Sequence, residues 1–354
     1  MRYWRRYVVL LAIGLVLGAC GHHKDTVRIG LGDKVWGPEP KPSDAPYSIR
    51  AKDHAARYVV YAMLADLAYV TPPPEAMQVA GQDLRGVVYK PKLDDLKTKG
   101  RSDYTPEQVT AGEAWLTDWR FIAGYTHENV PAPQTWRPRL SGLGISIWKK
   151  YGADGRCQEM AIAFRGSDKS FDDWWTNFRW VTRLVPLEDQ YDQVLAALSL
   201  IIDTHDKSGE CPRLVTTGHS LGGGLAHLAA YLDKRISYVY AFNSSSVTGF
   251  YAVDRAVRDV TANGLMVDRV YEHGEALAYL RLVMRGLYPV ASCEPQIRSI
   301  RFDLLSGNTV HNHSMSGMVI KLLELARAPQ PGTAYAALPD TPSCPPRLAP
   351  PMGQ

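Results

Sequence analysis

The chain has only a small excess of charge of one sign. Its 354 residues include 40 Lys plus Arg and 36 Asp plus Glu, a formal net charge of +4. Three of the positive charges, Arg2, Arg5 and Arg6, lie at the N-terminus, and without them the balance would be 37 to 36. Nucleic-acid-binding proteins need a broad basic surface that neutralises phosphates. We therefore expect no nucleic-acid partner.

The sequence also lacks a hydrophobic run of about 18 residues, the length that a membrane-spanning helix requires. The uncharged run at residues 7–19 follows the three arginines and, as a helix, is too short to cross the ~30 Å hydrocarbon core of a bilayer. A basic segment followed by a short apolar run is typical of a secretory signal peptide. We predict a signal peptide over residues 1–19.

The end of this segment, Leu17-Gly18-Ala19-Cys20, resembles the lipobox of bacterial lipoproteins. The resemblance implies that Cys20 is lipidated and that its acyl chains hold the protein on a membrane at ~0.8 kcal/mol per buried methylene. Gly21 offers no acidic signal for retention in the inner membrane. A place in the bacterial cell envelope is then expected, with the outer membrane favoured and the protein facing the periplasm or the exterior. A plain signal peptide with an incidental cysteine is the alternative.

Cysteine is scarce. The chain has five, and setting Cys20 aside leaves Cys157, Cys211, Cys293 and Cys344. None are spaced as the C-x-x-C pairs of structural zinc sites, so we expect no metal site. An even number of cysteines in an exported protein predicts two disulfides, for which four cysteines allow three pairings.

The middle of the chain alternates short apolar runs with longer amphipathic ones. This rhythm predicts an α/β fold with a mostly parallel sheet and helices on both faces. The alternation of apolar and charged residues over 298–305 further indicates an edge strand. The predicted strands are residues 160–164, 213–217, 237–242, 265–271 and 298–305, and the predicted helices are residues 58–69, 191–205, 221–234, 253–260 and 315–328.

The flanking segments are rich in proline and polar residues. Residues 20–50 are predicted to be a tether, 51–330 the α/β domain and 331–354 a proline-rich tail. Within the domain, an irregular stretch at about 92–140 contains Trp115, Trp119 and Trp136. We expect this insertion to cap the active site, with core packing of the tryptophans as the alternative.

One turn carries the chemistry. Residues 218–222 read G-H-S-L-G and lie between a predicted buried strand and a predicted helix, as a G-x-S-x-G nucleophile elbow requires. Gly218 and Gly222 flank the serine where strand and helix must pass closely. The turn holds Ser220 in a strained conformation at a helix N-terminus, where N–H groups stabilise an oxyanion. Ser220 is the predicted nucleophile.

Together with an F-R-G-S turn ending at Ser167 and a D-D-W-W segment at 172–175, the G-H-S-L-G-G sequence resembles the class 3 (fungal-type) lipases. The resemblance covers roughly residues 58–327 and implies the α/β-hydrolase fold. It also implies that the oxyanion hole is formed by Ser167 and by the backbone N–H of Leu221. No metal or organic cofactor is needed for this chemistry.

The remaining two catalytic groups are assigned by chain order, because these hydrolases run Ser…acid…His. Glu275 stands after the predicted strand 265–271, where lipases usually carry aspartate. We favour it as the acid over Asp268, which falls inside the strand. His313 directly precedes the last helix, where the family places its histidine, and we favour it as the base over His311.

These residues predict a lipid-anchored serine hydrolase that cleaves carboxylic esters of acylglycerols or phospholipids through an acyl-enzyme. A non-catalytic envelope lipoprotein that uses a hydrolase scaffold for binding is the alternative. The sequence leaves open the acyl-chain length, the head group and the oligomeric state.

The fold also predicts one disulfide. In α/β-hydrolases the strand before the oxyanion turn and the nucleophile strand are parallel neighbours that end at the same edge. Cys157 lies seven residues before Phe164 and Cys211 six before Thr217, the ends of these strands. We therefore expect a bridge between Cys157 and Cys211, because adjacent strands are only ~4.8 Å apart. This leaves Cys293 and Cys344 to pair.

Overall fold

The computed structural model describes residues 26–30, 35–36, 51–70, 104–131, 142–166, 189–278, 281 and 295–326. In this part of the chain, the strands form a single nine-stranded sheet in the order β2-β1-β9-β8-β7-β6-β5-β4-β3. The strands are β1 (Thr26–Gly30), β2 (Val35–Trp36), β3 (Trp119–Thr126), β4 (Gly144–Tyr151), β5 (Cys157–Phe164), β6 (Leu214–His219), β7 (Ile236–Phe242), β8 (Met266–Glu272) and β9 (Gln296–Asp303). The helices are α2 (Ala51–Leu67), α5 (Pro106–Trp115), α7 (Gln190–His205), α8 (Leu221–Leu232), α9 (Arg255–Ala262), the 3-10 turn η2 (His311–His313) and α11 (Met315–Ala326).

The centre of the sheet is parallel and its two ends are antiparallel. Neighbouring strands from β1 through β9, β8, β7 and β6 to β5 pair in parallel, whereas β1–β2, β4–β5 and β3–β4 pair antiparallel. Parallel strands joined through helices place the carboxyl ends of β6, β7 and β8 at one edge. This arrangement is the α/β-hydrolase fold predicted from the sequence.

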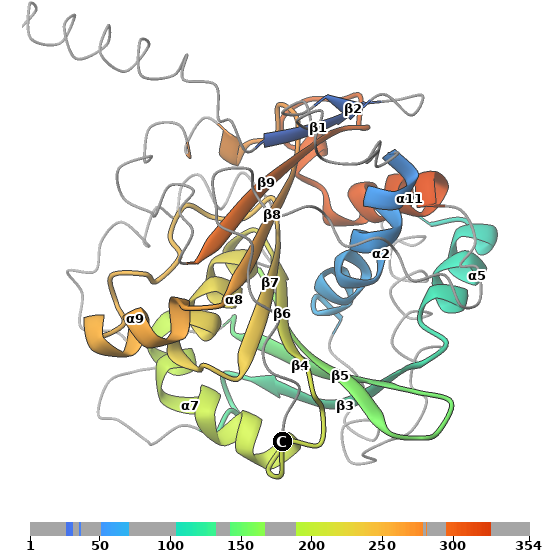
Figure 1. The fold of residues 1–354 in the computed structure, drawn as a ribbon. Coiled ribbons are helices and arrows are strands. Elements are labelled where there is room, and N and C mark those ends of the chain that lie inside the picture. The colour runs from blue at the N-terminus through green and yellow to red at the C-terminus, as the bar shows by residue number, and fades with distance from the viewer. Residues whose placement is uncertain are drawn as a thin grey trace, which may run out of the picture.

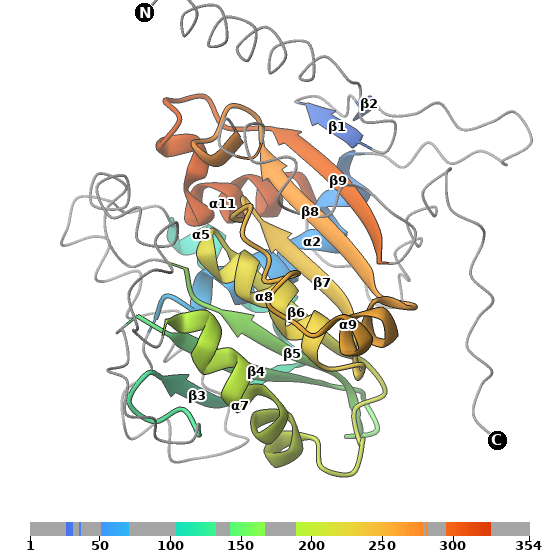
Figure 2. The same ribbon diagram turned by 90° about the vertical axis from the view of Figure 1, so that its left-hand side faces the viewer.

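Helices cover both faces of the sheet (Figure 1), and the view turned by 90° shows α7 and α8 lying in front of the sheet (Figure 2). α2, α5 and α11 share one apolar cluster with the sheet, and α7 and α8 share the other. The side chains of β5 alternate between them: Ala161 and Ala163 belong to the first cluster, and Met160, Ile162 and Phe164 to the second. A strand that is buried on both faces has apolar residues at successive positions. This explains why the sequence shows these strands as short, unbroken apolar runs.

Two sequence predictions need correction at the β9 edge. β9 is not an edge strand, because β1 pairs with it in parallel, with Ile29 opposite Phe302. β1 and β2 belong to the predicted tether, so residues 26–30 and 35–36 are part of the sheet rather than a linker. Residues 26–30 (T-V-R-I-G) have β-prone side chains, but the segment is too short to stand out in a polar, proline-rich region.

The stretch at 92–140 is described over residues 104–131, and this part belongs to the body of the domain. Residues 106–115 form α5 and residues 119–126 form β3, the end strand beside β4. Trp115 and Trp119 are 8% and 3% exposed and pack in the same cluster as α2. Their position corresponds to the second alternative, core packing. Trp136 lies outside the described residues.

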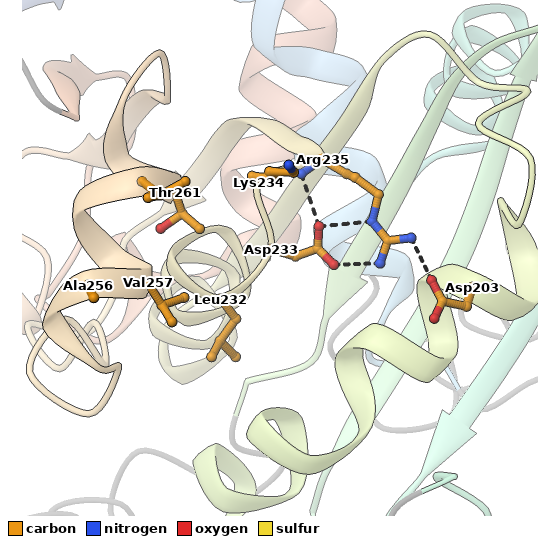
Figure 3. A pocket seen from close by; sticks show the side chains of 9 residues that line it. Asp203, Leu232, Asp233, Lys234, Arg235, Ala256, Val257 and Thr261 are labelled. Carbon is orange, nitrogen blue, oxygen red and sulfur yellow. Dashed lines mark hydrogen bonds and ion pairs between the residues drawn. The ribbon is translucent and has the colours of Figure 1, made fainter.

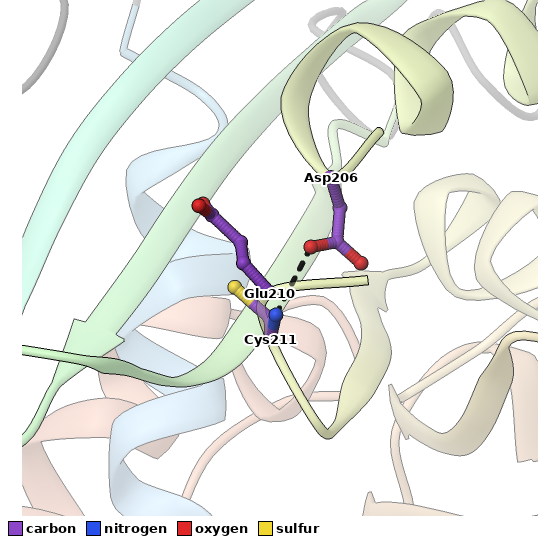
Figure 4. Close-up of side chains that lie close together, drawn as sticks. All are labelled: Asp206, Glu210 and Cys211. Atoms are coloured by element: carbon purple, nitrogen blue, oxygen red, sulfur yellow. Dashed lines mark hydrogen bonds between the residues drawn. The ribbon is translucent and has the colours of Figure 1, made fainter. Parts of the chain in front are cut away.

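The predicted disulfide between Cys157 and Cys211 is confirmed, with a Cα–Cα distance of 4.9 Å. The register explains it: Phe164 pairs with Gly218, and each cysteine lies seven residues before its strand's member of that pair. The two cysteines therefore meet at the edge opposite Ser220. Figure 4 shows Cys211 beside Asp206, whose Oδ1 accepts the Cys211 N–H at 3.0 Å.

Several predictions fall outside the described residues. These are the signal peptide at 1–19, the lipidation site Cys20, the cysteines Cys293 and Cys344, and the tail at 331–354. Among the helices that the structure describes, none has the length and apolar character needed to cross a membrane.

Candidate active site

Ser220 stands at the turn between β6 and α8, as the motif predicted. Its backbone has φ 58° and ψ −124°, a positive-φ conformation that a non-glycine residue adopts only at a cost. Neighbouring backbone holds it there: the Ser220 N–H donates to the Phe242 carbonyl at 3.0 Å, and the Ser220 carbonyl accepts from the Ser245 N–H at 2.9 Å. The strained turn is thus fixed by the end of β7 and the loop that follows it.

The two motif glycines are required by close packing. A Cβ on Gly218 would lie 2.3 Å from the Gly222 carbonyl oxygen, and a Cβ on Gly222 would lie 2.2 Å from the Phe164 carbonyl oxygen. Real Cβ atoms do not approach backbone this closely, so any side chain at either position would push β5, β6 and α8 apart. The predicted role of Gly218 and Gly222 follows directly from this geometry.

The predicted acid and base are hydrogen-bonded to each other. His313 Nδ1 lies 2.7 Å from Glu275 Oε2. Since an ionised carboxylate can only accept, Nδ1 carries the proton and Nε2 keeps the lone pair that a general base needs. Glu275 is fully buried, and the His313 side chain is 13% exposed. The histidine is therefore the member of the pair that reaches the surface.

Both oxygens of Glu275 have further partners. Oε2 also accepts the Leu277 N–H at 2.8 Å, and Oε1 is paired with the Arg281 guanidinium. Burial would raise the pKa of Glu275, but the charge of Arg281 and the hydrogen bond from His313 outweigh it and hold the pKa below its ordinary value. Glu275 is consequently an anion at neutral pH.

The His313 turn is fastened to the nucleophile elbow. His219, next to Ser220, donates from Nε2 to the His313 carbonyl at 2.8 Å, and the two imidazole rings lie 4.7 Å apart. With Nε2 donating, His219 Nδ1 accepts from the Tyr69 hydroxyl at 2.9 Å. Chain segments from α2, β6 and η2 therefore meet at the end of β6.

The two alternatives considered from sequence lie elsewhere. Asp268 is fully buried inside β8, where it is paired with Arg298 and accepts hydrogen bonds from Tyr58 and Tyr238. Burial would raise its pKa, but the arginine charges lower it below the ordinary value. The Asp268 carboxylate thus binds these buried side chains rather than either candidate histidine. His311 is exposed at the start of η2.

The oxyanion hole is described in part. Leu221 opens α8 directly after the nucleophile, so its N–H is at the helix N-terminus. Ser167 lies outside the described residues, but Gly166 before it is close to the nucleophile: a Cβ on Gly166 would lie 3.3 Å from Ser220 Cβ. The same Cβ would lie 2.2 Å from the Tyr69 hydroxyl, which places that hydroxyl at the same edge.

Two site residues were not predicted from the sequence, Arg281 and Tyr69. Arg281, six residues after Glu275, contacts its carboxylate, and Tyr69, which follows α2, reaches the elbow from 150 residues away in sequence from His219. No motif marks either position: Arg281 is near Glu275 in the chain but belongs to no known pattern, and Tyr69 is brought to the site by tertiary packing.

Two other features of the described residues lie away from this edge. Asp206, Glu210 and Cys211 are close enough to suggest a metal site, but Cys211 is in a disulfide and offers no thiolate. A groove of about 640 Å³, shown in Figure 3, lies where α8 turns into β7, at the amino end of the parallel strands. Arg235 bridges Asp233 and Asp203 in its wall. Neither feature shares residues with the Ser220 site.

Part of the chain is similar to a known family of phospholipase-like domains. Residues 127–294 match the Tle-like phospholipase domain. The match includes Ser220 and Glu275 and ends before His313. No curated protein matches the chain in sequence.

Among solved structures, similar chains include lipase II from Rhizopus niveus, with 17% identity over 63% of this chain and 72% of that chain and a TM-score of 0.37. A Rhizomucor miehei lipase–propeptide complex has 16% identity over 69% and 72% of the two chains and a TM-score of 0.36. A Pyrobaculum calidifontis esterase has 10% identity over 72% and 99% and a TM-score of 0.30. The domain match, together with the site, supports a hydrolase of lipid esters.

Proposed function

We propose that this protein is a serine hydrolase that cleaves carboxylic esters of lipids through an acyl-enzyme. The observation that carries the proposal is the hydrogen-bonded Glu275–His313 pair, fastened through His219 to the elbow that holds Ser220 at φ 58°. An acid, a partly exposed imidazole and a strained serine at a helix N-terminus are the parts that acyl transfer needs. The phospholipase domain match over residues 127–294 supports a lipid substrate.

In this mechanism the Ser220 hydroxyl attacks the acyl carbonyl and His313 Nε2 takes the hydroxyl proton. Glu275 keeps the imidazole in the correct tautomer and stabilises the imidazolium. The Leu221 N–H and Ser167 bind the oxyanion. His313 then protonates the leaving alcohol, and water attacks the acyl-enzyme by the reverse sequence of proton transfers. Among lipid hydrolases, the F-R-G-S and G-H-S-L-G-G sequences support a relation to the class 3 (fungal-type) lipases.

We also propose that the protein is exported and anchored by lipid at Cys20. The lipobox-like sequence at 17–20 supports this, and the Cys157–Cys211 disulfide agrees with an oxidising compartment. An anchored enzyme would meet acylglycerols or phospholipids at a membrane surface of the cell envelope. Replacing Cys20 by Ala should abolish incorporation of labelled palmitate and release the protein from membrane fractions; membrane retention without label would instead indicate an uncleaved signal segment.

The decisive experiment is covalent labelling with a fluorophosphonate probe. The wild type should label, Ser220→Ala should not, and Ser237→Ala, which alters an exposed serine of β7, should label like the wild type. Release of fatty acid from phosphatidylcholine vesicles should follow the same order. Product analysis by mass spectrometry would then separate phospholipase from acylglycerol lipase activity.

The same experiment decides the non-catalytic alternative. A folded wild type that neither labels nor releases fatty acid from phospholipid or triacylglycerol would favour a binding role for the scaffold. The intact Glu275–His313 hydrogen bond speaks for catalysis, because a binding protein has no need of a buried carboxylate aimed at a partly exposed imidazole.

A further inference from the structure

Arg281 is a buried arginine that the mechanism above does not use. Its side chain is 10% exposed, and its guanidinium makes three kinds of contact. One end is paired with Glu275 Oε1, the other donates to the Ser244 carbonyl at 2.8 Å, and its Cζ atom lies 4.9 Å from the centre of the Tyr271 ring. A guanidinium suits this place because it has several fixed donors and stacks on aromatic rings.

The two polar contacts join the two halves of the site. Glu275 belongs to the turn after β8, which carries the acid. Ser244 belongs to the loop after β7, whose next residue, Ser245, donates its N–H to the Ser220 carbonyl. Arg281 therefore connects the acid turn to the backbone that holds the nucleophile.

The contacts also explain why a glutamate can occupy a position where lipases usually carry aspartate. Glutamate has one more rotatable bond, so its carboxylate needs more fixing than that of aspartate. Here Oε2 is shared by the Leu277 N–H and His313 Nδ1, and Oε1 is fixed by Arg281. With both oxygens bound, the carboxylate has one orientation toward the histidine.

We propose that Arg281 is a positioning residue for catalysis, which fixes the Glu275 carboxylate toward His313 and partly neutralises its charge. The neutralisation matters because an unopposed carboxylate favours the imidazolium, the form of the histidine that cannot accept a proton. Arg281 thus keeps His313 available as a base at lower pH. This inference rests on the proposed function.

Other titratable groups near the pair are His219, whose ring lies 4.7 Å from that of His313, and Glu272, which is buried at the end of β8. Arg301 is the second arginine beside the Tyr271 ring, at 5.9 Å. Glu272 titrates near neutrality, with its pKa raised by burial to about 7. The test must therefore separate the effect of Arg281 from that of Glu272.

The test is the pH profile of kcat/KM for a short-chain nitrophenyl ester, measured for the wild type, Arg281→Met and Arg258→Met. Arg258 is a matched control: it also donates to a backbone carbonyl, that of Phe250, and stacks on an aromatic ring, but it lies in α9 away from the site. We expect Arg281→Met to lower kcat at least tenfold with little change in KM, and to move the acidic limb upward by about one pH unit. Arg258→Met should keep both kcat and the limb, and the shift should persist in a Glu272→Gln background.

Two further variants make the result decisive. In a Glu275→Gln background, Arg281→Met should have no further effect on kcat, because there is no charge left to neutralise. Arg281→Lys, which keeps the charge but loses the planar fork, should keep the limb and lose part of kcat; it replaces Arg281→Met if that variant does not fold. An unmoved limb in Arg281→Met, or full kcat in Arg281→Lys, would overturn the proposal. Fluorophosphonate labelling of the wild type separates the two proposals. If the role of Arg281 is wrong but the proposed function is right, the wild type still labels; if the proposed function itself is wrong, the wild type does not label.

Discussion

Two carboxylates of the β8 region show how one strand serves both stability and chemistry. Asp268, inside β8, is paired with the buried Arg298 and with Arg57, and it accepts hydrogen bonds from two buried tyrosines. Glu275, in the turn after β8, is buried to the same degree, but one of its partners is the partly exposed imidazole of His313. Both carboxylates have lowered pKa values because arginine outweighs burial. The partner, rather than the burial or the charge, therefore distinguishes the catalytic candidate from the structural anion.

Neutralising Glu275 should have the largest effect on activity. Glu275→Gln should lower kcat by roughly 10³–10⁴-fold, because an amide can present its N–H to His313 and stabilise the wrong tautomer. The melting temperature should fall less than in Asp268→Asn, because Glu275 pairs with one arginine, Arg281, where Asp268 pairs with two, and the glutamine can keep the hydrogen bond from Leu277. Kinetics on a soluble ester and thermal unfolding of the same preparation check both parts. A rate within threefold of wild type would remove Glu275 from the mechanism.

Neutralising Asp268 should have the opposite signature. Asp268→Asn leaves the arginine charges of Arg298 and Arg57 buried without their counter-ion, which should lower the free energy of unfolding by about 3–5 kcal/mol. The fraction that stays folded should label with fluorophosphonate and turn over at the wild-type rate. Urea unfolding and active-site titration measure the two quantities separately. Normal stability combined with a large loss of kcat would return the role of the acid to Asp268.

A third buried carboxylate, Glu272, lies between these two in the chain but has no arginine partner among the residues that the structure describes, and its pKa moves in the opposite direction. It is 1% exposed, and its Oε1 accepts the N–H groups of Leu304 and Leu305. Burial raises its pKa from 4.5 to about 7, although these backbone hydrogen bonds act in the other direction. Between pH 4.5 and 7 the folded protein therefore holds a proton that the unfolded chain releases.

The sign of the resulting pH dependence follows from this difference. Because the folded state binds the extra proton, the free energy of unfolding should fall as pH rises through this window, by up to on the order of 3 kcal/mol. Glu272→Gln cannot titrate and should show a flatter curve, whereas Glu128→Gln, at a carboxylate whose side chain is 81% exposed, should keep the wild-type curve. Urea unfolding at pH 5, 6, 7 and 8 measures the slopes. Equal slopes in all three proteins would show that Glu272 is ionised in the folded protein.

The sequence was most informative where the regular geometry of parallel strands lets a residue count along the chain predict a position in the fold. The Cys157–Cys211 bridge could be predicted because parallel strands keep their register, so similar counts back from the active edge bring the two cysteines together. Glu275 could be favoured over Asp268 because the carboxyl end of a parallel strand is where such sites form. Both inferences use backbone periodicity and need no knowledge of side-chain packing.

Where packing decides, the sequence was silent or misleading. Residues 26–30 form a strand by pairing with β9. A five-residue segment contains no pattern that predicts pairing with a strand more than 260 residues away. The tryptophans at 115 and 119 have the composition of a lid, yet they fill the core beneath α2. Arg281 and Tyr69 reach the site through contacts that no motif encodes.

The smallest changes in stability and activity are expected from removing one of two tyrosine hydroxyls. One belongs to the network around Asp268 and the other to the contacts around Ser220 and His313. Tyr58 donates to Asp268 at 2.9 Å, and Tyr69 to His219 at 2.9 Å. Tyr58→Phe removes a hydrogen bond to a buried charge and should lower the free energy of unfolding by about 1.5–3 kcal/mol with kcat unchanged. Tyr69→Phe should instead lower kcat/KM by roughly tenfold, because His219 loses the partner that fixes its ring and so holds the His313 carbonyl less firmly. Its stability loss should be smaller, since the Tyr69 contact is only part-buried. Measuring urea unfolding and ester hydrolysis for both variants decides the matter: if Tyr69→Phe changes only stability, the Tyr69–His219 contact belongs with the structural network around Asp268.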